Sequence, residues 1–367
     1  MGRAMTLAAL LLQLAAAGCT RHVLRDADPA RGVRLPADHA AHTDAQTEWW
    51  HFHGHLVDEQ GRRYDWFLAF IKQHTDLDRV LFLPVRWFVD PFHASYFAVT
   101  DRARGQMHVR EKHSYPDTWS ASARQDSLSL RHDSWTARLD GDTLTLRAST
   151  LRARAELELR PAKPPALIGR RGYLHVPPRS SHYYYSIPRL TTSGTLVLDG
   201  ERRAVRGLGW LKHEWGFLYT DHLDGWTWFG VQLSSGHDLE IGLVFDRQWN
   251  LAQGSFAVVE EPDGRVTQLD VREVGVTESG AIWRSPRTRQ IYPTGWTLEL
   301  PGRGTVTLRA AVDAQEMVVF PANMWAGGMT VEGIFDGQRV TGDAFSEVVG
   351  LDRPFGRSLF RSGHPSR

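Results

Sequence analysis

The chain has 367 residues, which is enough for two domains or for one large β-domain. Its formal net charge is +1 and its acidic and basic residues are interspersed, which argues against nucleic-acid binding. Its 14 tryptophans are unusually many, and rings of this size fill cores or line pockets for apolar ligands.

Residues 1–19 are predicted to be a lipoprotein signal. The apolar run of residues 7–17 is too short to span a bilayer and ends in small residues before Cys19, the single cysteine. This arrangement resembles a bacterial lipobox, in which the cysteine is lipidated; a buried free thiol is the alternative. Because Thr20 rather than Asp follows, the Gram-negative sorting rule implies an anchor in the outer membrane, at its periplasmic face.

Residues 20–45 are polar, rich in Ala, Asp, Arg and Pro, and show neither helical nor strand periodicity. We expect a flexible tether that spans roughly 25–30 Å. The tether would hold the folded body away from the membrane surface.

The stretch TEWWHFHGHL, residues 47–56, alternates as a β-strand does. One face carries Trp49 and a row of three histidines, His51, His53 and His55. The other face places Glu48 among apolar rings. The histidine row could bind a metal, or it could face solvent or a domain interface. We favour Glu48 on the inner face and the histidines on the outside or at the interface, and we expect no metal.

The rest of the chain alternates in short runs separated by hairpin turns. Asp-Gly pairs lie at residues 140–141, 199–200, 263–264 and 336–337, between alternating segments. This pattern predicts an all-β fold. A connector with five prolines, residues 160–181, divides the body into two domains, residues 46–181 and 182–353, followed by a tail, residues 354–367.

Several common catalytic motifs are missing from the sequence. Gly207 and Gly209 lack the third glycine and the βαβ context of a dinucleotide site, and there is no nucleophile elbow. His213 and Glu214 resemble the start of a zincin motif, but no histidine follows four residues later and the neighbours indicate a strand. We therefore expect no cofactor.

Two carboxylates, Glu48 and Glu214, lie in strand patterns crowded with aromatic residues. Burial of a carboxyl group in such surroundings raises its pKa, which suits a general acid. The alternative is that each carboxylate pairs with a buried cation or caps backbone groups.

A set of ordered motifs resembles the AttH/CrtC-like lipocalin family across residues 46–352. The motifs are TEWWHFHGHL, HYYYSIPRLTTSGTLVLDG, VRGLGWLKHEWG, GWTWFGVQL, YPTGWTLELP and MWAGGMTVEG with FSEVVG. This family includes bacterial carotenoid 1,2-hydratases (hydroxyneurosporene synthases), fungal hydratases and cyclases. The resemblance implies two lipocalin-like antiparallel β-barrels packed together.

The family motifs and their departures can be assigned residue by residue. The E-W-W motif falls on residues 48–50, the Y-Y-S motif on residues 184–186 and the H-E-W-G motif on residues 213–216. His51 stands where a tyrosine is usual, and Thr227 and Ala326 stand where the family often has acids. The two missing acids put hydratase activity in doubt, because function depends on the site rather than on the fold.

Three functional hypotheses follow. The first is a membrane-anchored protein that binds an apolar, unsaturated small molecule or lipid in an aromatic cavity. The second is a hydro-lyase or cyclase in which Glu214 or Glu48 acts as the general acid and His213 places a water. The third is an accessory lipoprotein of an ABC-type permease. The expected ligand-binding residues are Trp49, Trp50, Tyr184, Tyr185, Trp215, Trp226, Trp228 and Trp325.

Overall fold

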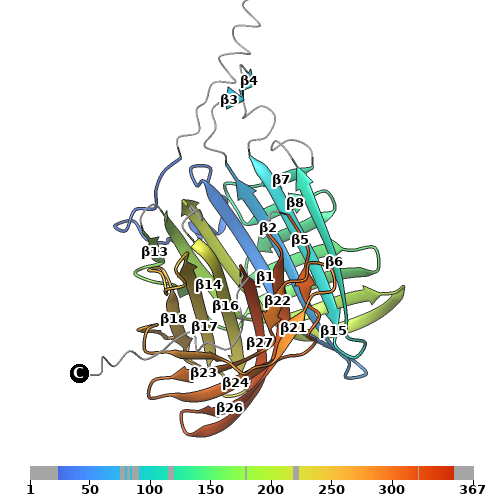
Figure 1. The fold of residues 1–367 in the computed structure, drawn as a ribbon. Helices are drawn as coiled ribbons and strands as arrows, with labels where there is room; N and C mark the ends of the chain where they lie inside the picture. The colour runs from blue at the N-terminus through green and yellow to red at the C-terminus, as the bar shows by residue number, and fades with distance from the viewer. Residues whose placement is uncertain are drawn as a thin grey trace, which may run out of the picture.

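The computed structural model describes residues 24–74, 79–80, 83–84, 91–114, 120–177, 180–217, 223–320 and 322–350. Within these ranges, the chain forms β-strands, connections and one short 3-10 helix, η1 (Ala37–His39). The predicted all-β class is confirmed, with most strands in two curled antiparallel sheets (Figure 1). None of the described helices is long and apolar enough to cross a membrane.

The first sheet has 13 strands and curls into a nearly closed barrel. Its order is β6-β5-β2-β1-β15-β14-β11-β10-β9-β8-β7, with β12 and β13 also paired to β14. The strands are β1 (Thr47–Asp58), β2 (Arg63–Gln73), β5 (Phe92–Asp101), β6 (Gln106–Ser114), β7 (Ala121–Ala123), β8 (Ser129–His132), β9 (Trp135–Asp140), β10 (Thr143–Ser149), β11 (Ala153–Pro161), β12 (Ala166–Leu167), β13 (Tyr173–Val176), β14 (Ser180–Leu198) and β15 (Glu201–Phe217).

The second sheet has 10 strands and forms a half-barrel. Its order is β19-β18-β17-β16-β27-β26-β24-β23-β20, with β25 paired to β26. The strands are β16 (Leu223–Leu233), β17 (Asp238–Asp246), β18 (Phe256–Glu260), β19 (Val266–Leu269), β20 (Gly275–Glu278), β23 (Gly295–Leu300), β24 (Gly304–Ala310), β25 (Glu316–Met317), β26 (Met324–Phe335) and β27 (Gln338–Val349). Two small hairpins pair β3 (Arg79–Val80) with β4 (Leu83–Pro84), and β21 (Ile282–Arg284) with β22 (Ile291–Pro293).

All four predicted Asp-Gly turns are confirmed. They join β9 to β10, β14 to β15, β18 to β19 and β26 to β27. At the second turn, Asp199 and Gly200 have φ angles of 51° and 84°. Positive φ at both central residues gives the turn a twist that matches the twist of the two flanking strands, and Asp-Gly adopts it readily.

The division between the sheets differs from the predicted domain boundary at residue 182. That position lies inside β14, which pairs with both β11 and β15 of the first sheet. The chain enters the second sheet only at β16, after residue 217. The Pro-rich connector does not end the first sheet, because the long strand that follows it hydrogen-bonds back to β11.

The segment predicted as a tether, residues 20–45, is folded from residue 24 onward, so this prediction is wrong for the described part. Ala27, Ala41 and Ala45 are buried in the core of the first barrel. The backbone N–H of Asp28 donates to the Tyr183 hydroxyl at 2.7 Å. Small side chains allow the segment to lie close against the barrel without any repeating pattern. The predicted signal with Cys19 and the predicted tail lie outside the described residues.

Each sheet encloses its own apolar core, and a third apolar cluster joins the two sheets. In this third cluster, side chains from β2, β5 and β15 pack against side chains from β16, β26 and β27. The outer face of the first barrel near β1, β2 and β15 is therefore covered by the second sheet. Any polar group on that face is removed from water.

Candidate functional site

Side-chain alternation divides the β1 motif between two environments. Trp50 points into the first barrel, and Glu48 lies on the same inner side. His51 and His53 point toward the second sheet, where His51 contacts Glu347. The structure agrees with the interpretation from sequence that Glu48 is on the inner face. For the histidines, which were expected on the outside or at the interface, it shows His51 and His53 at the interface.

The histidine row does not gather around one point. His51 Nδ1 lies 3.3 Å from Glu347, and His55 Nδ1 lies 2.6 Å from Asp65. His53, between them, stacks on an aromatic ring instead. The three histidines therefore serve separate contacts and do not form a metal-binding set.

Alternation divides β14 and β15 in the same way. Tyr185, His213 and Trp215 lie inside the first barrel, where their rings are in contact. Tyr184 and Glu214 face the second sheet and are directly opposite each other in the strand register. One motif thus supplies side chains to two different sites.

The predicted catalytic set is split by this arrangement. Glu48 meets His213 inside the barrel, whereas Glu214 pairs with His182 Nε2 at 3.0 Å on the opposite face. A single site that contains both carboxylates is excluded by these positions. Of the predicted ligand-binding residues, the first barrel holds Trp50, Tyr185 and Trp215, the interface holds Trp49, Tyr184, Trp226 and Trp228, and the second core holds Trp325.

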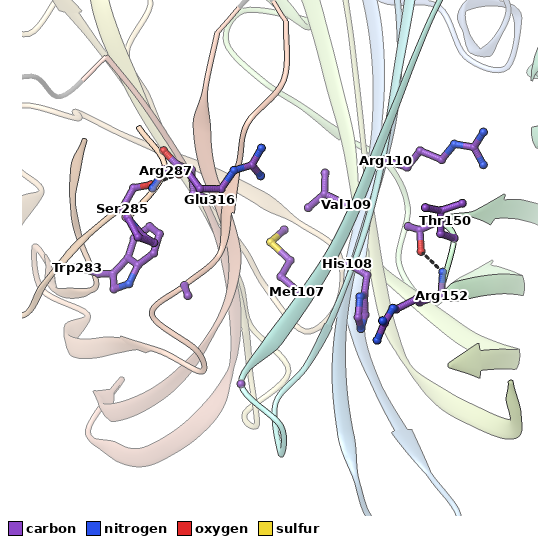
Figure 2. Close-up of a pocket in the computed structure, with 14 residues that line it drawn as sticks. Met107, His108, Val109, Arg110, Thr150, Arg152, Trp283, Ser285, Arg287 and Glu316 are labelled. Atoms are coloured by element: carbon purple, nitrogen blue, oxygen red, sulfur yellow. Dashed lines mark hydrogen bonds between the residues drawn. The ribbon is translucent and has the colours of Figure 1, made fainter. Parts of the chain in front are cut away.

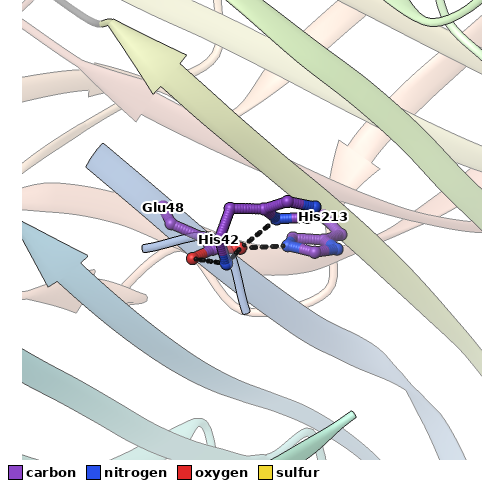
Figure 3. Close-up of side chains that lie close together, drawn as sticks. All are labelled: His42, Glu48 and His213. Carbon is purple, nitrogen blue, oxygen red and sulfur yellow. Dashed lines mark hydrogen bonds and ion pairs between the residues drawn. The ribbon is translucent and has the colours of Figure 1, made fainter. Parts of the chain in front are cut away.

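The buried Glu48 carboxylate is held by four groups, and Figure 3 shows the two histidines that contribute to them. His42 Nδ1 and His213 Nε2 lie 2.8 Å and 3.0 Å from Oε1. The Lys72 ammonium lies 2.8 Å from Oε2, and the backbone N–H of His42 donates to the same oxygen at 2.9 Å. Because His42 belongs to the segment that covers the barrel, these contacts tie that segment in place.

These contacts overturn the prediction that Glu48 is a protonated acid. Burial alone would raise the pKa of Glu48, but Lys72 and the hydrogen bonds from His213 and His42 hold it well below its usual range. Burial lowers the pKa of His213 to about 4, so this imidazole is neutral near pH 7. Glu48 is therefore an ionised partner rather than a proton donor.

The donor atoms of His42, Glu48 and His213 lie within 4.8 Å of one another, so two nitrogens and one carboxylate oxygen are available as metal ligands. The residues fit a metal poorly, however, because the Lys72 ammonium already neutralises the same carboxylate. We assign this group to the attachment of the N-terminal segment.

A second polar group is buried between the sheets, which we call the intersheet layer. It comprises Trp49, His51, His53, Tyr184, Ser186, Trp210, Lys212, Glu214, Trp226, Trp228, Glu240, Phe345 and Glu347. The members of this layer from the first sheet lie in two adjacent rows across β1, β15 and β14. One row is Trp49, Glu214 and Tyr184. The next row is His51, Lys212 and Ser186. Directly opposed residues on one face lie close enough to interact.

One ion pair in the intersheet layer links the two sheets. Lys212 Nζ of β15 lies 2.8 Å from Glu347 Oε1 of β27, and His51 Nδ1 approaches the same oxygen at 3.3 Å. Burial opposes ionisation of Glu347, but Lys212 and His51 outweigh it and hold the pKa of Glu347 below its usual range. Burial lowers the pKa of His51, which keeps its imidazole neutral.

Glu240 of β17, another carboxylate of the layer, forms no ion pair with the described residues. It accepts hydrogen bonds from the Tyr184 and Ser186 hydroxyls and, at 3.0 Å, from Trp228 Nε1. Burial raises the pKa of Glu240, and the three donors and the charge of Lys212 offset only part of this effect. Burial and the neighbouring carboxylate also raise the pKa of Tyr184 well above its usual value.

Trp228 lies at the centre of the layer. The Lys212 ammonium sits 3.9 Å from its ring centroid, a cation–π contact, and the rings of His53 and Trp210 approach it edge-on at 5.1 Å and 5.7 Å. Its indole N–H reaches Glu240. The layer therefore combines a carboxyl group whose pKa burial raises, a carboxylate whose pKa a lysine holds low, and aromatic faces, and such groups suit acid–base chemistry on an apolar substrate.

Sequence reasoning missed Glu240 and Glu347 as site residues. Each interrupts an apolar strand, DLEIGLVFD and AFSEVV, on the face opposite the core-directed residues. The sequence signal that could have identified them is a single acidic residue on the non-core face of an otherwise apolar strand. Lys212 lies two residues before Glu214, on the same strand face, but its partner 135 residues away cannot be identified from the local pattern.

A separate open cleft of about 770 Å³ lies between β6 and the β21–β22 hairpin (Figure 2). Its lining includes Met107, Arg110, Trp283 and Arg287. Most of these side chains are partly or fully exposed, and the buried Glu316 in its wall is bound by hydroxyl groups. We place the candidate site in the intersheet layer, because paired buried acid–base groups are gathered there.

Comparisons with known proteins agree with this architecture. A protein from Nitrosomonas europaea described as AttH has a structure with a TM-score of 0.78 and 24% identity, covering 89% of this chain and 99% of that chain. Kievitone hydratase from Nectria haematococca has a TM-score of 0.68 and 15% identity, covering 89% and 96%. At these identities the likeness establishes the fold.

One characterised relative is similar in sequence. The dehydratase asqC of Emericella nidulans is 26% identical over 178 residues, which is 46% of this chain and 50% of the relative, so the match spans about half the length of that protein. The AttH-like family model matches residues 26–351, nearly the whole folded body and including most of the segment predicted as a tether. This chain belongs to the AttH-like family.

Proposed function

We propose that the protein is a hydro-lyase that adds water to, or removes water from, an apolar unsaturated substrate held between the two sheets. The observation that carries this proposal is the Glu240–Tyr184 pair, which is buried beside Trp228 and forms no ion pair with the described residues. Relatives in the same family are a hydratase and a dehydratase by name, which supports the reaction class.

The chemistry assigns a role to each part of the layer. In hydration, a neutral Glu240 carboxyl group donates a proton to one carbon of the double bond. The faces of Trp226 and Trp228 stabilise the positive charge that develops on the other carbon. Water adds to that carbon and gives up its second proton, and Glu240 regains a proton in the next cycle. Dehydration runs through the same steps in reverse.

The experiment compares two carboxylates that are chemically alike. Purified protein is incubated with a bacterial lipid extract in H₂¹⁸O, and products with one added water are sought by mass spectrometry. Glu240→Gln should reduce the product about 10²–10⁴-fold, the usual contribution of a general acid. Glu316→Gln is the matched control, because Glu316 also accepts from a tyrosine and two other hydroxyl groups, but in the wall of the surface cleft.

Three results would separate the alternatives. Loss of product in Glu240→Gln alone supports the proposal. Loss in Glu316→Gln alone would move the active site to the cleft. A ligand that binds the parent protein and is released unchanged would support the carrier hypothesis, in which the layer binds an apolar molecule without turnover.

We also propose that the protein is anchored to the outer membrane through Cys19, because the sequence before it resembles a lipobox. Since the chain is folded from residue 24, only residues 20–23 would separate the anchor from the first barrel, about 13–14 Å when fully extended. Mass spectrometry of the N-terminal peptide from membrane-extracted protein would test this; an unmodified thiol at Cys19 would contradict it.

A further inference from the structure

His53 is a buried polar residue that the protein leaves without a hydrogen-bond partner. It is 2% exposed, and neither Nδ1 nor Nε2 has a partner. Among the described histidines it is the one for which this holds at both ring nitrogens. Trp210 lies directly opposite it in the β1–β15 register, is also 2% exposed, and has an unpartnered Nε1.

Such groups cost free energy. A buried donor or acceptor that loses its water without gaining another partner destabilises the folded state. Buried polar groups in native proteins are therefore nearly always bonded to protein, water or ligand. Three buried nitrogens on two opposed side chains therefore lack hydrogen-bond partners. We expect a polar group from outside the chain, a ligand or a water, to pair with them.

The surroundings of His53 show why no protein group fills this place. Its ring stacks on Phe345 at 4.6 Å, meets Trp228 edge-on at 5.1 Å and lies over Trp210 at 6.1 Å. Three aromatic side chains thus form apolar walls around the imidazole. Burial and the nearby Lys212 lower the pKa of His53 well below its usual value, so the ring is neutral.

A neutral imidazole offers one N–H donor and one acceptor nitrogen, and an indole offers one donor. A hydroxyl group or water fits two of these three groups: Trp210 Nε1–H can donate to its oxygen, and the acceptor nitrogen of His53 can accept its hydrogen. The imidazole N–H then needs a second oxygen. A carboxylate has no hydrogen for the acceptor nitrogen, and an ammonium has no acceptor for either donor, so an O–H group fits these side chains better than either ion.

We infer that His53 and Trp210 form the subsite that binds the hydroxyl oxygen of the substrate, or the water that becomes it. This inference rests on the proposed hydro-lyase function, and it locates the oxygen atom that is added to or removed from the substrate. Trp228 lies between this subsite and Glu240, since it contacts both His53 and Trp210 by its ring and Glu240 by its N–H. The oxygen subsite and the proton donor are thus on two sides of one indole.

The step balances with these residues. In hydration, the Glu240 O–H bond breaks and its proton forms a C–H bond with the π electrons of the double bond. The water oxygen, held by the His53 acceptor nitrogen, then forms a C–O bond to the other carbon and loses one proton, which the Glu240 carboxylate takes up to restore its O–H bond. The net change is the addition of H₂O across C=C, with no change in total oxidation state.

The test uses two flat aromatic probes that differ by one hydroxyl group, 2-naphthol and naphthalene. Binding is followed by the indole ¹H–¹⁵N signal of Trp210, which is identified by its loss in Trp210→Phe. We expect 2-naphthol to bind the parent protein at least 10-fold more tightly than naphthalene. His53→Phe should reduce this preference to less than twofold, because phenylalanine keeps the stacking and removes both nitrogens.

Two controls make the result specific. Trp296→Phe removes another buried, unpartnered indole N–H, in the core of the second sheet, and should leave the preference unchanged. His53→Phe should fold with an unchanged or higher melting temperature, because it replaces an unpaired polar ring with an apolar one among aromatic neighbours.

A preference for 2-naphthol that persists in His53→Phe, or no preference in the parent protein, overturns the subsite. Failure of both probes to bind the parent protein also overturns the subsite. The subsite and the enzyme proposal can fail separately: a 2-naphthol preference that depends on His53, in a protein whose turnover does not depend on Glu240, would leave a hydroxyl-binding site without the proposed catalysis.

Discussion

At the scale of single residues, three buried carboxylates differ in the direction of their pKa shifts. Glu48 meets Lys72, and Glu347 meets Lys212, so their pKa values stay low despite complete burial. Glu240 accepts hydrogen bonds only from neutral donors, and burial raises its pKa. Among these three acids, a low pKa goes with a lysine at hydrogen-bond distance.

Glu260 provides a test of this rule through the pH dependence of stability. It is 2% exposed, neither carboxylate oxygen has a partner, and Asp238 lies opposite it in the strand register. Burial, with contributions from Asp238 and Glu240, raises the pKa of Glu260 to about 8, although Lys163 and Arg189 act in the other direction.

Because the folded-state pKa of Glu260 exceeds the unfolded value, its protonated form stabilises the fold below about pH 4.5, and this contribution is lost as pH rises through about 8. We expect the free energy of unfolding to fall by about 2–4 kcal/mol between pH 5 and pH 8 through this residue. Urea unfolding at several pH values should show a flatter profile in Glu260→Gln; an identical profile would contradict the prediction.

At the scale of elements, a strand whose two faces are both buried serves two functions. In β1, β14 and β15 the even and odd positions of each motif go to different sites, one inside the first barrel and one between the sheets. The N-terminal segment is likewise more than a connection, because His42 enters the barrel and binds Glu48. Its folding depends on contacts with residues that are distant in the sequence rather than on its own periodicity.

The attachment of this segment predicts a large effect of Glu48→Gln. The substitution leaves Lys72 buried without its carboxylate and weakens the two contacts to His42. Removing one partner of a buried ion pair costs about 3–5 kcal/mol. Urea unfolding should show a loss of this size, together with faster proteolysis within residues 24–46.

The control is Asp126→Asn, which breaks the exposed pair between Arg124 and Asp126. Solvent screens this pair, so no measurable change in stability is expected. If Glu48→Gln changed stability no more than this control, the segment would not be held by the Glu48 group.

At the scale of the whole molecule, the intersheet layer joins two sheets that each have a separate core. The Lys212–Glu347 pair is its ionic link, and both side chains are nearly fully buried, at 6% and 3% exposure. A buried pair of this kind contributes to correct docking of the sheets, and its loss leaves an uncompensated charge.

A double-mutant cycle measures this link. Lys212→Met should lower the free energy of unfolding by about 3–5 kcal/mol, because Glu347 then remains buried and charged. Adding Glu347→Leu should recover part of the loss, since the unpaired charge is removed. Additive losses in the double variant would show that the two side chains do not act as a pair.

Local patterns in the sequence determined the strand class, the four Asp-Gly turns and the sidedness of β1. Each of these depends on a residue and its near neighbours: alternation sets the face, and the turn requires positive φ. The same alternation placed Glu48 on the inner face and the histidines on the opposite face, but it did not decide between the surface and the interface. The family resemblance supplied the barrel architecture, which the structure and the family match confirm.

Only the tertiary structure decided which charges meet. Glu48 was expected to be an acid, but its protonation depends on Lys72 and His42, and Tyr184 finds Glu240 56 residues away. The folding of residues 24–45 and the separation of Glu214 from His213 were equally invisible in the local pattern. Periodicity gives each side chain a face; the partner on that face depends on how distant strands register and how the two sheets pack.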